Sequence, residues 1–361
     1  MRQYILVASF LAFVVNANLA QNQITLEDIY VKGKFSAKSV PGFNFMNDGK
    51  YYTTLRNNSV NKNDITTGNV TESLFNGADF KGKANFNGRI GGYAFSDDES
   101  KILIESEWEQ VYRHSSQVKC HVYDTKSKTL TEVYTYGKVI NPQLSPDGTK
   151  VAFVSKNNLY VQNLSNNNVT QLTMDGAKNS IINGMSDWVY EEEFSFTRAF
   201  YWSPDSKKIA YIRFDESKVP EFTMQLYNGD MYPENETFKY PKVGEKNSDV
   251  SVWVYEFARG KAVKADIGDL TEMYVPRLKW TQDASQLCIY KLNRHQNELK
   301  LYLLDTKNYK SSILYEEKNQ YYVSIDDNLT FLKDKRHFIW LSEKEGYNQV
   351  YLMGMDGKQK V

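Results

Sequence analysis

The chain has 361 residues with 44 basic and 44 acidic side chains, so its formal net charge is zero. This balance argues against a nucleic-acid-binding protein, which needs a clustered basic surface. The 41% hydrophobic content excludes a disordered chain, and 8 prolines and 2 cysteines exclude a collagen-like chain and a disulfide scaffold. A typical domain of roughly 150 residues allows two domains or one large β architecture.

Residues 1–20 have the pattern of a secretory signal peptide. Arg2 supplies a positive charge, and an apolar stretch follows at residues 4–15. Cleavage is compatible with a position after Ala17 or after Ala20. The alternative is an N-terminal membrane anchor, for which the apolar stretch is short. We therefore expect export of the protein, to the periplasm or the medium.

The cysteines and histidines do not indicate a bound metal. Cys120 and Cys288 lie in separate strand-like segments, so we expect two buried free thiols rather than a disulfide. None of the four histidines has a spacing typical of metal ligands. The sequence predicts neither a metal nor a cofactor.

A polar turn that contains an aspartate recurs along the chain, each time after an apolar residue and before an alternating strand. The spacing is near 50 residues, with one gap of 78. Short alternating strands that repeat at this period are typical of propeller blades. We expect an all-β propeller over residues 21–361, with about six blades and an end within a blade. The turn aspartates are Asp48, Asp98, Asp147, Asp205, Asp283 and Asp334.

Each turn has a local cause. Asp-Gly and Pro-Asp-Gly supply the backbone angles that tight turns between antiparallel strands require. The strand that follows alternates apolar and polar residues, so we expect its apolar face to pack against the neighbouring blade.

The gap of 78 residues predicts an insertion of roughly 25 residues in one blade, judged against the repeat period. Tyrosines and prolines are frequent at residues 227–242. This composition is compatible with an ordered arm that presents aromatic surface to a partner, and equally with a loop folded on its own blade.

Three consecutive carboxylates, Glu191, Glu192 and Glu193, follow the aromatic segment Trp188-Val189-Tyr190. Buried together they would repel one another and lose hydration. They are tolerated in a solvated turn, or in a site that receives a cation.

The segment Asp187-Trp188-Val189-Tyr190-Glu191-Glu192-Glu193 and the segment Tyr112-Arg113-His114-Ser115 closely resemble dipeptidyl peptidase IV, of the prolyl oligopeptidase clan of serine peptidases. Similar pieces run from residues 24–29 to residues 343–347 and cover nearly the whole mature chain. The resemblance implies an eight-bladed propeller combined with an α/β-hydrolase domain. It also implies release of N-terminal dipeptides with proline, or less well alanine, in second position, and a homodimer formed in part by the inserted arm.

The resemblance assigns roles to three residues. Glu192 and Glu193 match the glutamates that hold the α-ammonium of the substrate, and Arg113 matches the arginine that binds the first carbonyl oxygen. The chain is one residue shorter than animal members just after the triplet, so Glu191 stays open as a member of that pair. The implied partners are peptides with a free amino terminus, and the implied role is a propeller that gates and recognises them.

The nucleophile of such an enzyme is missing from these residues. A serine hydrolase of this clan needs a G-x-S-x-G turn, and Gly184-Met185-Ser186 is a lone partial match without the second glycine. We expect this chain to be the N-terminal part of the enzyme and to be inactive by itself. The alternative is a non-catalytic propeller that serves as a binding or scaffold module.

Overall fold

A computed structural model describes residues 23–37 and 42–361 of the chain. It divides into a short unit that ends at Phe43 and a large unit from Asn44 to Val361. The short unit contains a single helical turn, η1 (Glu27–Val31), closed by the Lys32 amide donating to the Glu27 carbonyl. The predicted signal peptide, residues 1–20, lies outside the described residues. Among the described residues, no helix has the length and apolar character needed to cross a membrane.

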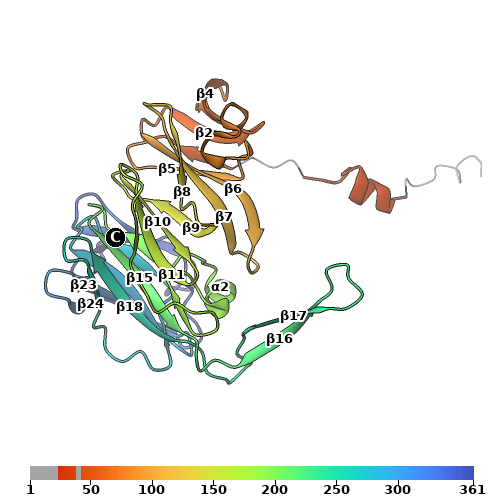
Figure 1. The fold of residues 1–361 in the computed structure, drawn as a ribbon. Helices are drawn as coiled ribbons and strands as arrows, with labels where there is room; N and C mark the ends of the chain where they lie inside the picture. The colour runs from red at the N-terminus through yellow and green to blue at the C-terminus, as the bar shows by residue number, and fades with distance from the viewer. Residues whose placement is uncertain (1–22, 38–41) are drawn as a thin grey trace, which may run out of the picture. The chain divides into compact units, whose positions relative to one another are not determined.

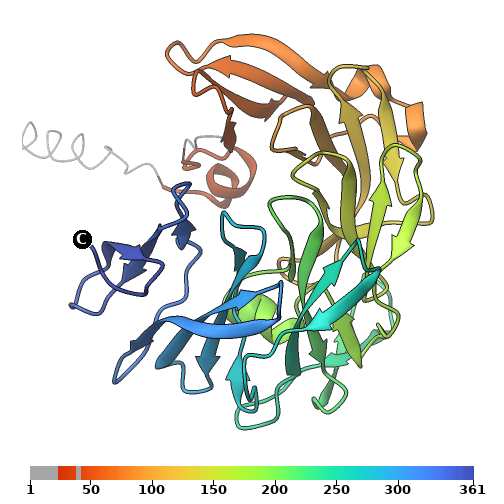
Figure 2. The ribbon, with the colours of Figure 1, turned by 90° about the vertical axis from the view of Figure 1, so that its left-hand side faces the viewer.

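The large unit is built from small antiparallel sheets that follow one another in chain order (Figures 1 and 2). The first sheet has the order β1-β2-β3-β4 and is followed by two short 3-10 turns, η2 and η3. Their bounds are β1 Phe43–Phe45, β2 Tyr51–Arg56, β3 Ser59–Asp64, β4 Val70–Asn76, η2 Gly77–Phe80 and η3 Lys83–Asn85.

The second and third repeats share one eight-stranded sheet. Strand β7 pairs with β8 near one end, while Gln117 and Val118 near its other end pair with Ile140 and Val139 of β9. The sequence repeat predicts separate blades here, and the long β7 joins them. The bounds are β5 Gly92–Phe95, β6 Lys101–Gln110, β7 Ser116–Asp124, β8 Leu130–Val133, β9 Val139–Leu144, β10 Lys150–Ser155, β11 Asn158–Asn163 and β12 Val169–Gln171.

The last three repeats form one sheet each. The fourth repeat also carries the helix α2. The elements of this repeat are β13 Ile181–Asn183, α2 Trp188–Phe194, β14 Phe200–Trp202, β15 Lys208–Asp215, β18 Asp249–Glu256 and β19 Lys261–Lys264. The fifth contains β20 Met273–Tyr274, β21 Leu278–Trp280, β22 Gln286–Asn293, β23 Glu298–Asp305 and β24 Lys310–Lys318. The sixth contains β25 Thr330–Phe331, β26 His337–Ser342 and β27 Gln349–Gly354.

All six predicted turns join two strands within one repeat. In each, the aspartate carboxylate accepts a hydrogen bond from the backbone N–H two residues later, at 2.9 to 3.2 Å. This local bond satisfies a backbone donor that the turn would otherwise leave free. The repeat that the sequence predicts is therefore confirmed, and so is the all-β class.

The predicted alternation holds in β26, where every second residue is buried, but other strands after the turns differ from it. Residues 151–154 of β10 and residues 209–212 of β15 are all buried. A strand buried on both faces needs apolar residues at successive positions, because neighbouring sheets cover each side. Cys120 and Cys288 are buried in such strands as free thiols, as predicted.

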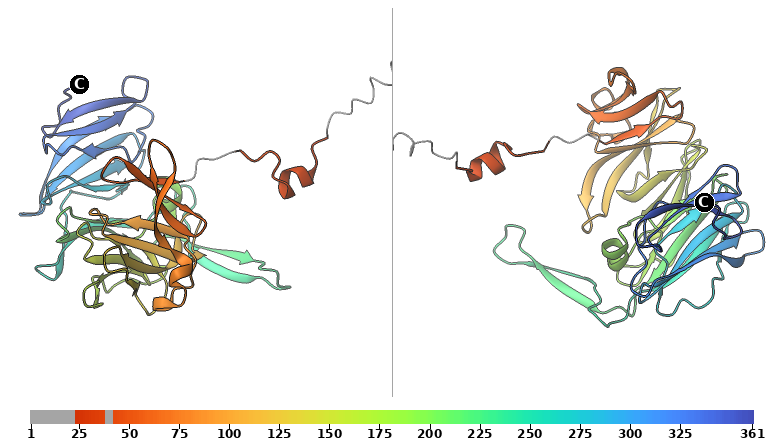
Figure 3. Two further views of the ribbon diagram at one scale, coloured as in Figure 1. Left: turned by 90° about the horizontal axis from the view of Figure 1, so that it is seen from above. Right: turned by 180° about the vertical axis from the view of Figure 1, so that it is seen from behind.

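The insertion is an ordered arm. It forms a separate two-stranded sheet of β16 (Glu221–Leu226) and β17 (Glu234–Lys239), which extends away from the other sheets of its unit (Figures 1 and 3). The structure therefore has an ordered arm rather than a loop folded on its own blade, and a partner surface on the arm stays a prediction.

Candidate functional site

The glutamate triplet lies on the seven-residue helix α2, an element that the search for repeats does not predict. Asp187 caps its N-terminus: one carboxylate oxygen accepts from the Tyr190 N–H at 2.9 Å, and the other accepts from the Ser248 hydroxyl at 2.5 Å. An aspartate before an aromatic run is the local signal that indicates this helix start. The helix ends at Ser195, which has a left-handed backbone conformation (φ 56°).

Tyr190 anchors the helix in the core. Its ring packs on Phe194 and Phe214, with centroids 5.1 and 4.9 Å apart, and its hydroxyl accepts from the Val275 N–H at 3.0 Å. Burial raises the pKa of the Tyr190 phenol well above its usual range, so the hydroxyl stays neutral. The helix is therefore a rigid support for the carboxylates that follow Tyr190.

The helix turns the three glutamates in different directions. Glu191 is fully buried, Glu192 keeps 15% of its side chain exposed, and Glu193 is exposed. Successive residues point about 100° apart on a helix, so three adjacent carboxylates cannot share one face. We call the carboxylates of Glu192 and Glu193 outward, because solvent reaches Glu193 freely and Glu192 in part, whereas Glu191 is covered.

Arg113 lies in the turn of the hairpin between β6 and β7, and Figure 1 shows the end of this hairpin close to α2. Its Nε lies 3.4 Å from the Glu192 Oε1, and 72% of its side chain is exposed. The structure therefore brings together Arg113 and Glu192, which the sequence separates widely. Burial is the main cause that raises the pKa of Tyr274, and the carboxylates of Glu272 and Glu193 add to it.

Several acidic groups are buried close to Asp187, the residue that caps the helix. Burial and the neighbouring Asp187 carboxylate raise the pKa of Glu216 to about 7. Burial also raises the pKa of Asp187, and hydrogen bonds from Ser248 and the Tyr190 N–H oppose that rise. Burial, Glu216 and Glu191 raise the pKa of Tyr112 to about 12. The interior below the site thus disfavours additional negative charge, whereas the outward face can receive a cation.

The base of the arm packs against both parts of the site. Trp188 of α2 lies 4.2 Å from Tyr240 between ring centroids, and Tyr112 of the hairpin tip lies 6.0 Å from Phe238 of β17. Phe238 and Tyr240 also contact each other at 6.0 Å. These rings connect the arm to the residues beside Arg113 and the glutamates.

Ser186, the lone partial match to a nucleophile turn, is not placed for catalysis. It is buried, and its hydroxyl has no hydrogen-bond partner among the described residues. A serine nucleophile needs a base within hydrogen-bond reach and access to substrate. In residues 23–37 and 42–361, no three His, Cys, Asp or Glu side chains gather as a metal site.

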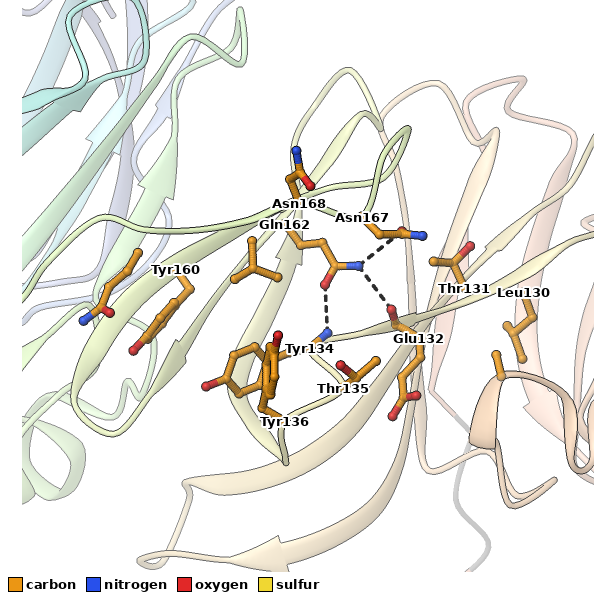
Figure 4. A pocket seen from close by; sticks show the side chains of 13 residues that line it. Leu130, Thr131, Glu132, Tyr134, Thr135, Tyr136, Tyr160, Gln162, Asn167 and Asn168 are labelled. Atoms are coloured by element: carbon orange, nitrogen blue, oxygen red, sulfur yellow. Dashed lines mark hydrogen bonds between the residues drawn. The ribbon is translucent and has the colours of Figure 1, made fainter.

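A cavity of about 800 Å³ lies between β8 and β11 (Figure 4). Neither Arg113 nor a residue of the glutamate triplet lines it. Gln162 is buried in its wall and bonds to the Tyr134 N–H and the Glu132 carbonyl, at 2.8 and 3.1 Å. The Glu132 carboxylate is already bound by Lys119 and Asn85. The cavity therefore offers tyrosine rings and amides rather than free charge, and the sequence contained no signal for it, because its residues come from separate strands.

A family model and curated relatives both match this chain. The family model described as the dipeptidyl peptidase IV (DPP IV) N-terminal region matches residues 96–361. The chain is 32% identical over 230 residues to a probable dipeptidyl-aminopeptidase B of Pyrenophora teres f. teres, covering 59% of this chain and 25% of that protein. It is 30% identical over 283 residues to prolyl endopeptidase FAP of Bos taurus, covering 76% and 36%. The chain thus spans between a quarter and just over a third of the length of these curated relatives.

Two solved structures resemble the fold. The crystal structure of Porphyromonas gingivalis dipeptidyl peptidase 4 matches with a TM-score of 0.88 and 34% identity, over 94% of this chain and 49% of that chain. A putative dipeptidyl aminopeptidase IV from Bacteroides ovatus matches with a TM-score of 0.69 and 24% identity, over 93% and 46%. The second likeness concerns the fold alone.

Proposed function

The chain belongs to the family of dipeptidyl peptidase IV N-terminal regions, and we propose that it gates and recognises the free amino terminus of peptide substrates. The enzyme in question is a serine peptidase that releases X-Pro and X-Ala dipeptides. Its nucleophile is expected in sequence beyond these 361 residues. We also propose that residues 1–20 direct export.

The contact between Arg113 and Glu192 is the observation that supports this proposal. Carboxylates attract an α-ammonium group, and a guanidinium donates hydrogen bonds to a carbonyl oxygen. In an N-terminal residue, the ammonium nitrogen and the carbonyl carbon are both bonded to the same Cα. An internal residue has no ammonium group. A site with Glu192, Glu193 and Arg113 together therefore measures distance from the amino terminus.

A blocked amino terminus tests the proposal. In the protein encoded by the complete reading frame around this chain, acetylation of an X-Pro reporter peptide is expected to lower kcat/KM by about 100-fold or more, the loss expected for a charge-assisted contact. Steady-state rates on the free and the acetylated reporter measure it. Equal values would contradict amino-terminal recognition. Residues 1–361 alone are the control and are expected to show no turnover.

The arm supports a second part of the proposal, a homodimer. Its tip exposes Met231 (87%) and Tyr232 (80%), apolar side chains that a partner surface would cover. The double variant Met231→Ser/Tyr232→Ser is expected to shift the complete protein from dimer to monomer in sedimentation velocity, with an unchanged melting temperature. Met174→Ser is the control, because Met174 lies outside the arm and is also largely exposed (74%). A dimer that persists in the double variant would rule out this surface.

A further inference from the structure

The hairpin tip that carries Arg113 is only partly held by its own hydrogen bonds. The Val111 N–H donates to the Ser115 carbonyl at 2.9 Å, and the Tyr112 N–H donates to the Ser115 hydroxyl at 3.1 Å. The N–H groups of His114 and Ser115, which follow Arg113, take their acceptor from elsewhere.

Glu191 provides that acceptor. Its Oε1 receives the His114 N–H at 2.7 Å and the Ser115 N–H at 2.9 Å, although 76 or 77 residues separate the partners. Two successive N–H groups that converge on one anion form a backbone nest, which offsets the cost of burying a carboxylate. The other oxygen, Oε2, has no hydrogen-bond partner among the described residues.

Both partners of this hydrogen bond are sequence neighbours of candidate site residues. Glu191 precedes Glu192, and His114 follows Arg113, so each residue of the contacting pair is adjacent to one residue of the buried bond. The Arg113–Glu192 contact is 3.4 Å long with a largely exposed arginine, and a pair of that kind contributes little by itself. The hydrogen bonds from His114 and Ser115 to Glu191 therefore constrain the position of the Arg113 backbone more strongly than the Arg113–Glu192 contact does.

We infer that Glu191 is a positioning residue: it does not hold the substrate ammonium but sets the distance between Arg113 and the two outward carboxylates. The inference rests on the proposed function and deepens it, because that distance determines the fit of an N-terminal residue. A shift of the hairpin tip would separate the group that reads the carbonyl oxygen from the groups that read the ammonium.

Two substitutions at Glu191 separate positioning from ligand binding. Both nest hydrogen bonds end on Oε1, so the amide oxygen of Glu191→Gln can accept them, and we expect less than a fivefold change in KM for a free-amino X-Pro reporter. Glu191→Leu fills the same space without an acceptor. We expect it to raise KM at least 30-fold with kcat changed only a few-fold, and to weaken discrimination against the acetylated reporter.

Hydrogen exchange gives a readout that does not depend on activity. In the complete protein, the amides of His114 and Ser115 are expected to exchange faster in Glu191→Leu than in the parent protein, with the core strands unchanged. Glu132→Leu is the matched control, because Glu132 is also a buried carboxylate with two partners but lies in another part of the fold. It is expected to leave KM and these two amides as they are.

The outcomes distinguish this inference from the proposed function. If Glu191→Gln loses as much as Glu192→Gln, Glu191 is itself a ligand and the inference is overturned. It is also overturned if Glu191→Leu leaves both KM and amide exchange unchanged while Glu192→Gln and Glu193→Gln are impaired. If those last two variants are unimpaired, the proposed function fails and the inference fails with it.

Discussion

Glu192→Gln and Glu193→Gln are each expected to lower kcat/KM for a free-amino X-Pro reporter by about 100-fold, mainly through a higher KM. Loss of one charged partner of an ammonium costs about 2 to 3 kcal/mol when the contact is partly desolvated, and each factor of ten corresponds to about 1.4 kcal/mol. The neutral amide keeps the size of the side chain, so the helix is expected to stay intact. Steady-state kinetics of the complete protein measure the change.

The two variants are expected to differ in one respect. Glu192 also contacts Arg113, so its loss frees the guanidinium and weakens recognition of the carbonyl oxygen as well. Glu193→Gln removes only an outward carboxylate. Glu72→Gln is the control, because Glu72 is an exposed glutamate on β4 in another sheet. Unchanged kinetics in both helix variants would refute the ammonium site.

Glu216→Gln is expected to stabilise the fold at high pH. Burial, the nearby Asp187 carboxylate and Asp215 raise the pKa of Glu216 from 4.5 to about 7, and Lys239 opposes this rise. A carboxyl group whose pKa is higher in the folded state contributes its full stability below the unfolded pKa. That contribution is lost as the pH rises from about 4.5 to about 7, where the folded protein must also release the proton.

The expected gain of Glu216→Gln above pH 7 is on the order of 3 kcal/mol, from a difference of roughly 2.5 pKa units. Denaturant unfolding of parent and variant at several pH values measures it. The difference in unfolding free energy between parent and variant isolates the effect of Glu216 from that of other titrating groups. One such group is Glu105, because burial raises its pKa to about 7 as well. Glu221→Gln is the control, because this exposed carboxylate pairs with the same Lys239. A difference that does not change with pH would contradict the assignment.

The repeat architecture is predictable from sequence because its cause is local. Each turn aspartate bonds a backbone N–H two residues away, so the residues that make the turn stand together in the chain. The buried thiols follow from equally local patterns of apolar strands. The helix α2 was missed because it has only seven residues, and its stability comes from Tyr190 and distant core partners rather than from a long apolar repeat.

The candidate site divides in the same way. The sequence establishes which side chains are suited to an ammonium and a carbonyl oxygen, because charge and hydrogen-bonding capacity belong to the residue itself. The tertiary structure decides which of them face outward and which partners they meet. Glu191 is turned inward and Arg113 meets Glu192 because sheets that are far apart in the chain pack together, and such contacts depend on the whole core rather than on any local pattern.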